Sequence, residues 1–375
     1  MKIAFNRPTV TGKELDYIRE ALEHHHISGD GLFTRRCHAW LQDRWGASRA
    51  LLTHSCTAAL EMAALLCELA PGHEVILPSY TFASTANAVV LRGAVPVFVD
   101  IRADTLSLDE TLIEAAITPR TRAIFVMHYA GGACEMTAIM DIARRHGLLV
   151  VEDAAQALLS RYRGRPLGSF GQLAAFSFHE TKNLISGEGG ALIVNDPRLI
   201  ERAEIIREKG TNRSKFFRGE VDRYTWVDVG SSYLPSDIIA AFLWAQFENA
   251  ETLAERRQTH WNRYHDGLAG LERAGRLRRP VILEGCAHNA HLYYLVLPDP
   301  PTRTALIAWL KQSGIMAPFH YVPLHSAPAG QRYGRMAGAL PVTEDLAGRL
   351  LRLPLWHDMT GEPEIVIDSI EAFFR

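Results

Sequence analysis

Cysteine is scarce in this chain. Five cysteines occur among 375 residues, an odd number, and no two of them form a Cys-x-x-Cys pair. A disulfide framework and a structural zinc site both need thiols at closer and more regular spacing. We therefore expect reduced thiols in a cytoplasmic protein. The cysteines are Cys37, Cys56, Cys67, Cys134 and Cys286.

Long apolar runs and an excess of one charge are also missing. The longest clean apolar run covers residues 238–245, whereas a membrane-spanning helix needs about 18 such residues. The first eight residues lack the apolar core of a signal peptide. Forty basic and 42 acidic residues give a net charge of −2. Such a balance offers no strong field to nucleic acid or to an anionic membrane, so we expect neither as a partner.

Several chemical motifs are absent or fail on geometry. There is no Walker A motif, which disfavours nucleotide hydrolysis, and residues 29–31 lack the context of a dinucleotide-binding fingerprint. Residues 24–26 are three histidines, but neighbours on a helix point about 100° apart and cannot share one metal ion. We expect no metal site. Glu152 and Asp153 are adjacent on a strand and should face opposite sides, which excludes a glycosidase pair.

The chain does contain a regular alternation of strands and helices. Its length corresponds to about two domains, and apolar residues make up 47% of it. Alternation with short connections predicts an α/β fold, with a mostly parallel mixed sheet flanked by helices. The predicted strands are 50–52, 74–77, 95–99, 123–127, 148–151, 174–178 and 191–194, and the predicted helices are 12–25, 34–45, 55–69, 82–91, 109–116 and 135–145.

A helical pattern then runs from residue 235 to about residue 274. That is long for a globular helix, so we expect it to bend or to link two domains. We place a large domain at residues 1–247 and a small C-terminal α/β domain at residues 248–375. In the latter we predict strands at 293–297 and 315–321, and helices at 302–312 and 362–373.

One lysine stands in an unusual place. Lys182 follows the apolar strand 174–178 and precedes the glycine-rich segment 186–190, which predicts a turn. In a dry pocket the pKa of a lysine amine falls, and the neutral amine is a nucleophile. Taken alone, the motif favours an exposed loop lysine.

Three more motifs fall at the ends of predicted strands. Asp153 closes an apolar strand at the end where open α/β sheets bind ligands. Residues 54–60 begin a helix whose free N–H groups could hold a phosphate, and Phe82 offers an aromatic face. Taken alone, Asp153 is explained equally well as a helix cap, residues 54–60 look like any capped helix, and core packing is the favoured explanation of Phe82. With Lys182 they supply what holds pyridoxal phosphate (PLP): a Schiff-base lysine, an acid for the ring nitrogen, a phosphate site and a stacking aromatic.

The same motifs resemble a known family. Residues 55–60, 78–82, 151–156, 176–183, 187–190 and 321–325 are similar to the DegT/DnrJ/EryC1/StrS sugar aminotransferases, and the similarity extends over essentially the whole chain. It implies the fold type I PLP-dependent transferase architecture and a homodimer with active sites at the interface. Residues 35–37, 60–66, 208–214 and 230–234 look closest to members that transfer the amino group of L-glutamate to C4 of dTDP-4-dehydro-6-deoxy-D-glucose.

This resemblance assigns roles to individual residues. Lys182 would bond covalently to PLP, Asp153 would pair with the ring nitrogen, Gln156 would meet the ring hydroxyl and Phe82 would stack on the ring. The phosphate would be held by Thr57, Ala58 and Ser177, and across the interface by Ser232. Many members have Asn at the position of Ser232, and serine has a shorter reach.

Candidates for substrate contacts are less sharply marked. Residues 207–223 are rich in cations suited to a diphosphate and are predicted to form a loop, which includes Arg213. We expect this loop to reach the substrate of the neighbouring subunit, with an ordinary exposed loop as the alternative. Tyr321 and His325 are further candidates for substrate contacts.

The leading hypothesis is amino transfer to a keto sugar nucleotide. Another ketone position or nucleotide carrier is the nearest alternative. A PLP-dependent sugar dehydratase is a second class, but the related dehydratases carry His at the Schiff-base position, where this chain has Lys182. A non-catalytic regulatory relative is a third class, and it would be expected to lack the lysine or the acid.

Overall fold

An eight-stranded sheet forms the centre of the protein in the computed structural model, which describes residues 2–375. The strand order is β1-β9-β8-β5-β4-β2-β3-β12, and only β9 runs antiparallel to its neighbours. The predicted mostly parallel α/β sheet is therefore confirmed. The strands are β1 (Arg49–Thr53), β2 (Glu74–Pro78), β3 (Val95–Val99), β4 (Thr121–Met127), β5 (Leu149–Asp153), β8 (Leu173–Ser177), β9 (Gly190–Val194) and β12 (Arg335–Met336).

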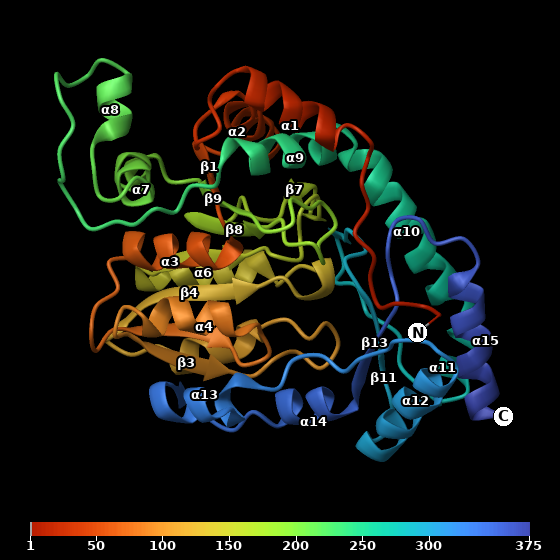
Figure 1. The fold of residues 1–375 in the computed structure, drawn as a ribbon. Coiled ribbons are helices and arrows are strands. Elements are labelled where there is room, and N and C mark those ends of the chain that lie inside the picture. Colours follow the sequence, from red (N-terminus) through yellow and green to blue (C-terminus); the bar gives the residue numbers. More distant parts are fainter. Residues whose placement is uncertain (1) are drawn as a thin grey trace.

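Helices cover both faces of this sheet because its side chains alternate between two apolar cores. On β5, Val150 packs into one core and Val151 into the other. Figure 1 shows α3 and α4 in front of the sheet and α6 behind it. The first core contains residues of α1 (Glu14–Glu23), α2 (Leu32–Trp45), α6 (Met136–His146) and α9 (Asp237–Glu248); the second contains residues of α3 (Cys56–Leu66), α4 (Ala83–Val90) and α7 (Ile200–Arg207).

The C-terminal part of the chain has a separate core. Trp261, Leu306 and Ile370 pack there with the strand pair β11–β13, and Ile3 from the N-terminal segment joins them. The division between this core and the cores of the large sheet lies near residue 247, where we predict a domain boundary. The boundary itself stays a prediction. The elements here are α10 (Ala250–Gly267), α11 (Ala269–Arg273), β11 (Tyr293–Val296), α12 (Pro300–Gln312), β13 (Leu350–Leu353) and α15 (Glu362–Phe374).

The long helical pattern bends, as expected. It divides into α9, α10 and α11, with breaks at Asn249 and Leu268. The Asn249 side-chain amide donates to the Ala245 carbonyl at 3.0 Å, and its backbone leaves helical geometry. A side chain that bonds the nearby backbone competes with the helical ladder, which explains the break there.

The predicted strand at residues 315–321 is wrong. Ile315 forms an isolated bridge with Ile3, and residues 316–321 form no strand. Pro318 has no N–H to donate and restricts the residue before it, so a ladder cannot continue through this segment.

The sequence also gave no sign of β12, which extends the large sheet beyond β3. Figure 1 shows α13 and α14 along that edge. Further elements without a prediction are α8 (Arg213–Phe217), α13 (Pro328–Tyr333), α14 (Pro341–Arg349) and a small sheet of β6 (Arg161–Tyr162), β7 (Arg165–Pro166) and β10 (Cys286–Ala287); the predicted helix 109–116 is a 3-10 turn followed by α5 (Ile113–Ala116).

Residues 211–231 project from the large domain, and we call this segment the arm (Figure 1). Part of the predicted loop 207–223 is helical here, because α8 lies within the arm. The side chain of Trp226 is 77% exposed. The other exposed apolar side chains of the arm are Phe216, Phe217, Tyr224, Val227 and Val229.

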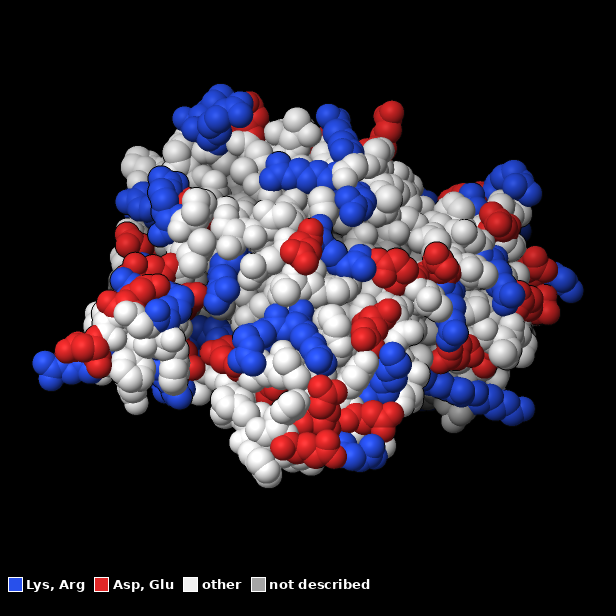
Figure 2. All heavy atoms as spheres, turned by 90° about the horizontal axis from the view of Figure 1, so that it is seen from above, with Lys and Arg blue, Asp and Glu red and all other residues white. Residues whose placement is uncertain are grey.

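The remaining general features concern the surface and the thiols. Acidic and basic side chains are interspersed over the face seen from above (Figure 2). None of the helices between residues 2 and 375 combines the length and apolarity that crossing a bilayer requires.

All five cysteines are free. Within the described chain, no three metal-binding side chains gather at one point. Because α1 ends at Glu23, the histidines 24–26 lie beyond it, and the helix argument used against them does not apply.

Candidate active site

A cavity of about 710 Å³ lies at the carboxyl ends of the parallel strands. The ends of β4, β5 and β8 and the start of α3 form one side of it, and residues 318–321 with β13 form the other. This is the edge of an open α/β sheet where ligands bind. The predicted residues that line it are Thr57, Phe82, Asp153, Gln156, Ser177, Lys182 and Tyr321.

Lys182 reaches this cavity from a tight turn after β8. Its backbone N–H donates to the His179 carbonyl at 2.9 Å, and Glu180 donates to the Gly187 carbonyl at 2.8 Å. Gly187 has φ +80, a conformation that glycine adopts without strain. Burial lowers the pKa of the Lys182 amine, and the negative charge of Asp153 opposes that shift. The turn thus presents to the cavity an amine that burial makes easier to deprotonate, which favours its use as a nucleophile.

Asp153 is the last residue of β5 and is 4% exposed. Its carboxylate accepts hydrogen bonds from the Thr85 hydroxyl at 2.7 Å and from the Ala155 amide at 3.2 Å. Burial raises the pKa of Asp153. The carboxylate forms no salt bridge within residues 2–375. A cationic ring nitrogen of a ligand would stabilise the ionised form, because each charge favours the other.

Glu152 points to the opposite face of the sheet, as the alternation predicts. Its carboxylate accepts hydrogen bonds from the amides of Gly168, Phe170 and Gly171 at 2.6–2.7 Å. His128 Nε2 lies 2.9 Å from the same carboxylate. Both side chains are buried. Glu152 therefore holds the loop behind the sheet and takes no part in the cavity.

The start of α3 fits a phosphate. Ser55 caps the helix by accepting a hydrogen bond from the Ala58 amide at 3.1 Å. The Cys56 and Thr57 amides donate to no acceptor within residues 2–375, so the positive end of the helix dipole keeps free donors. The Thr57 hydroxyl lies 2.7 Å from that of Ser84. Ala58, by contrast, has its amide occupied by the cap.

Gln156 and Tyr321 join the two sides of the cavity. The Gln156 side chain accepts from the Ala130 amide at 2.7 Å and donates to the Tyr321 hydroxyl at 2.8 Å. One hydrogen of the Gln156 amide group stays available for a ligand. Phe82 is 59% exposed, and its ring centre lies 6.3 Å from that of Tyr321.

Besides Ala58, which does not line the cavity, three predicted residues lie away from it. His325 is buried between Ser79, at 2.7 Å, and Glu344, at 3.2 Å, and this position gives no support to a substrate contact. Ser232 is exposed at the base of the arm. Arg213 stands on the arm, with its guanidinium 5.1 Å from the centre of the Phe217 ring.

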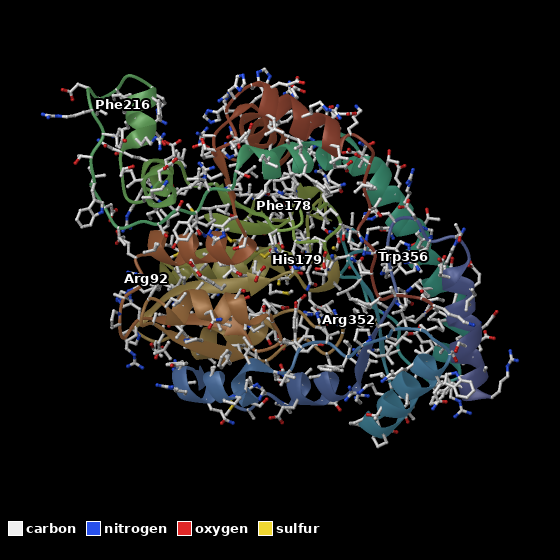
Figure 3. The ribbon with its side chains drawn as sticks, viewed as in Figure 1. Arg92, Phe178, His179, Phe216, Arg352 and Trp356 are labelled. Carbon is white, nitrogen blue, oxygen red and sulfur yellow. The ribbon has the colours of Figure 1, made fainter. Side chains whose placement is uncertain are left out.

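Sequence reasoning missed most of the C-terminal side of the cavity. Phe319, His320 and Arg352 line it beside Tyr321. Figure 3 shows His179 on the side of the large sheet and Arg352 at the C-terminal strands. The only signal for Arg352 is a single charge inside the apolar run 350–353.

The donor set fits PLP. A lysine whose pKa is lowered by burial and a buried carboxylate without a salt-bridge partner share one cavity with a helix start that has free amides. These groups match the aldehyde, the ring nitrogen and the phosphate of that cofactor.

Comparisons with known proteins agree with this chemistry. A family model, the DegT/DnrJ/EryC1/StrS aminotransferase family, matches residues 8–371. Spore coat polysaccharide biosynthesis protein SpsC of Bacillus subtilis is 33% identical, covering 99% of this chain and 96% of its own. The structure of S. venezuelae DesV with a ketimine intermediate is 32% identical, with a TM-score of 0.89, covering 100% and 99% of the two chains.

A third similar structure is Spr1654 from Streptococcus pneumoniae in its PLP-form. It is 26% identical, with a TM-score of 0.90, and the match covers 99% of this chain and 98% of that one. The family match, the fold and the lysine-aspartate cavity lead to one conclusion: the chain belongs to the DegT/DnrJ/EryC1/StrS aminotransferase family and is a PLP-dependent sugar aminotransferase.

Proposed function

We propose that the enzyme transfers the amino group of L-glutamate to C4 of dTDP-4-dehydro-6-deoxy-D-glucose and so forms dTDP-4-amino-4,6-dideoxy-D-galactose. This is the activity of dTDP-4-amino-4,6-dideoxygalactose transaminase, which supplies surface polysaccharide of the enterobacterial common antigen type. The observation that carries the proposal is that Lys182 and Asp153 line one cavity. Sequence similarity at residues 208–214 and 230–234 supports the choice of substrate, and the name of SpsC supports a role in polysaccharide synthesis.

The chain's own residues would divide the work as follows. When bound, PLP supplies an electron sink that makes a C–H bond next to nitrogen acidic. Asp153 holds the ring nitrogen in its protonated state. The Lys182 amine takes the proton from the α-carbon of the donor, and in the second half of the reaction it delivers a proton to C4 of the sugar. The face that Lys182 occupies then sets the configuration of the new amine.

The proposed enzyme is a homodimer whose arms complete the active sites. Arg213 and Ser232 lie outside the cavity of their own chain, on or beside the arm. The arm also exposes a group of aromatic side chains, a composition enriched at protein interfaces. Docked on a second copy, the arm would bring Arg213 toward the diphosphate of the partner's substrate. Ser232 would then lie toward the partner's phosphate site.

A panel of keto sugar nucleotides tests the substrate. The purified holoenzyme is given L-glutamate with 4-keto or 3-keto 6-deoxy sugars on dTDP, UDP or GDP, and kcat/KM is measured for each. We expect the dTDP 4-ketone to exceed every other substrate by about tenfold or more. NMR of the product should show an axial C4 amine. A preference for a 3-ketone or for another nucleotide would reject this substrate in favour of another sugar aminotransferase. A deoxygenated sugar without nitrogen would indicate a dehydratase.

A further inference from the structure

Asn183, the residue after Lys182, is fastened to a short segment from the C-terminal part of the chain. Its side-chain Nδ2 donates to the Asn289 carbonyl at 2.7 Å, and its Oδ1 lies 2.9 Å from Nδ1 of His291. All three side chains are buried. The side chain of Asn289 in turn donates to the Gln156 carbonyl at 2.9 Å. This segment therefore joins the Lys182 turn to the loop that carries Gln156.

The backbone between Asn289 and His291 is held in a strained conformation. Ala290 has φ +51, a left-handed value that is unfavourable for a residue with a Cβ atom. Arg257 of α10 fixes it, because Nε donates to the Ala290 carbonyl at 3.1 Å and Nη2 to the His291 carbonyl at 2.5 Å. This arginine is 1% exposed and has no anionic partner within residues 2–375. Strain that is held by a buried cation indicates that the position of the segment has a function.

The hydrogen bonds determine which nitrogen of His291 carries the proton. The Asn289 carbonyl can only accept, so Nδ2 of Asn183 faces it and Oδ1 faces His291. That oxygen also can only accept, so the hydrogen is on Nδ1 of His291. Burial lowers the pKa of His291 well below its usual value of 6.5, and the charge of Lys182 lowers it further, so the ring is neutral at pH 7. Nε2 is therefore a hydrogen-bond acceptor.

This acceptor shares the cavity with the amine of Lys182. Both residues line it. Within residues 2–375, neither Nε2 of His291 nor Nζ of Lys182 has a hydrogen-bond partner. Among the charges that affect the pKa of His291, that of Lys182 has the largest effect. The other titratable groups that act on His291 or Lys182 are Cys56, Asp153, Arg257, His320 and Arg352. A neutral acceptor beside an amine takes one of its N–H groups and so fixes the direction of its lone pair.

We infer that His291 orients the amine of Lys182 by accepting one of its N–H groups at Nε2, and that Asn183 keeps the hydrogen on Nδ1 for this purpose. The lone pair of the amine then points at the carbon or the proton that it attacks. The inference rests on the proposed role of Lys182 in bonding PLP. Because His291 contacts the reacting amine, it is a catalytic residue, whereas Asn183 and Arg257 are positioning residues.

Capture of PLP by cofactor-free enzyme tests this inference without an amino acid or a sugar. The nitrogen of Lys182 bonds the aldehyde carbon and water leaves, so visible absorbance in a stopped-flow instrument follows the reaction. The rate at saturating PLP, measured from about pH 6 to about pH 10, gives a plateau and a midpoint. His291→Asn keeps a donor near the place of Nδ1 and removes the acceptor. We expect its plateau to fall about 30-fold, because the amine is no longer aligned.

The midpoint of the same profile distinguishes orientation from mere structural support. In His291→Asn it should move about one pH unit lower, because a hydrogen bond to the ammonium form is lost. A midpoint that rises toward 10.5 would mean that the turn has opened to water, and it would overturn the inference. An unchanged profile would overturn it as well. So would a change of the plateau alone or of the midpoint alone.

A second variant and two controls keep the result interpretable. His291→Gln places an acceptor near the position of Nε2, and its plateau should lie within about fivefold of wild type. A plateau as low as that of His291→Asn would overturn the inference. Pyridoxamine phosphate has no aldehyde, and each variant should bind it within about threefold of the wild-type affinity if its cavity is folded. His73→Asn changes a histidine outside the cavity, whose Nδ1 accepts from the Ala70 amide at 3.2 Å, and should behave as wild type.

The captured residue is identified by borohydride reduction and peptide mass. Attachment of PLP at a residue other than Lys182 would reject the proposed function together with this inference. Attachment at Lys182 with a wild-type profile in His291→Asn would reject this inference alone.

Discussion

At the scale of single residues, the site depends on opposite charges placed in one cavity. Burial pushes Lys182 toward its neutral form and raises the pKa of Asp153, and each charge counteracts the shift of the other. Neither side chain has a salt-bridge partner within residues 2–375. The ligand must therefore supply the groups that both residues need, an electrophilic carbon for the amine and a cationic nitrogen for the carboxylate.

Lys182→Ala should bind cofactor and yet fail to turn over. The phosphate site and Asp153 are unchanged in this variant, but no amine remains to move the proton. We expect kcat to fall by about 10³-fold or more. Equilibrium titration of cofactor by fluorescence and a coupled assay for 2-oxoglutarate measure the two quantities. Near-native transamination by Lys182→Ala would contradict the proton-transfer role.

The pKa of Lys182 can be tested through cofactor uptake. Only the neutral amine attacks an aldehyde, so the rate of covalent PLP capture by cofactor-free enzyme should rise with pH. It should level off below the ordinary lysine value of 10.5, because burial lowers the pKa. Asp153→Asn removes the anion that raises this pKa, so its midpoint should move to lower pH. Stopped-flow absorbance from about pH 6 to about pH 10 covers the range, with a free lysine derivative as reference.

The same shift has a consequence for stability. Between the lowered folded pKa and 10.5, the unfolded chain binds more protons at Lys182 than the folded one does. The contribution of Lys182 to stability therefore increases with pH in this window.

For the cofactor-uptake experiment, one outcome would contradict the burial of the Lys182 amine: a dependence of the capture rate on pH that matches the dependence measured for the free lysine derivative.

The sequence was sufficient to identify residues whose type and neighbouring motif indicate a chemical role. It missed residues that reach the site only through packing between distant parts of the chain. Asp153 closes one apolar strand and Lys182 follows another within a few residues, next to a turn signal, so their position at the strand ends was predictable. His325 was expected to contact the substrate, but its ring bonds Ser79 and Glu344 instead. Arg352 faces the cavity only because β13 pairs with β11, a contact between distant parts of the chain.

At the scale of elements, the N-terminal start of α3 has two tasks. The Ser55 hydroxyl caps the helix and orients the free amides of Cys56 and Thr57. Ser55→Ala should cost about 1 kcal/mol of unfolding free energy and weaken PLP binding about fivefold. Denaturant titration measures the first quantity, and cofactor titration measures the second.

A matched control exists at another helix. Ser236 caps α9 in the same way, by accepting from the Ile239 amide, and it does not line the cavity. Ser236→Ala should lose a similar amount of stability and keep wild-type cofactor affinity. Equal cofactor affinity in both variants would show that the α3 cap has no part in binding.

Element prediction succeeded where a local signal controls the backbone. The start of α3 is indicated by Ser55, the span of β9 by its apolar residues, and the turn before it by Gly187. These elements appear as predicted. The strand predicted at residues 315–321 failed because Pro318 interrupts an otherwise β-prone run. The strand β12 is two residues long and exists only because β3 offers it an edge, which no local pattern reveals.

At the scale of the whole molecule, the arm is the feature that a single chain does not explain. It projects from the large domain (Figure 1), and Figure 3 shows Phe216 on it, away from the cavity. An isolated projection that exposes several aromatic side chains is costly in water, and a partner surface would remove that cost. The proposed dimer supplies such a surface and gives Arg213 a ligand.

Trp226→Ser should weaken the dimer. Trp226 is the most exposed apolar side chain of the arm, and loss of a buried interface tryptophan costs about 2 kcal/mol or more, about a 30-fold change in Kd. Sedimentation velocity over a concentration series measures Kd. Ile365→Ser is the control, because Ile365 is 55% exposed and belongs to α15, a helix that lies far from the arm in Figure 1. An unchanged Kd in Trp226→Ser would show that the arm does not form the interface.

Whether the arm acts on the partner's site can be decided with mixed dimers. Lys182→Ala removes the reacting amine from its own cavity, and Arg213→Ala removes a cation that would serve the other cavity. If Arg213 acts across the interface, a dimer with one chain of each kind contains one intact site and one site with both defects. Two differently tagged chains, co-expressed and purified through both tags, should then recover about half of the wild-type kcat/KM for the sugar nucleotide. If Arg213 served its own chain, every site of the mixed dimer would carry one defect, and activity would not exceed half that of the Arg213→Ala homodimer.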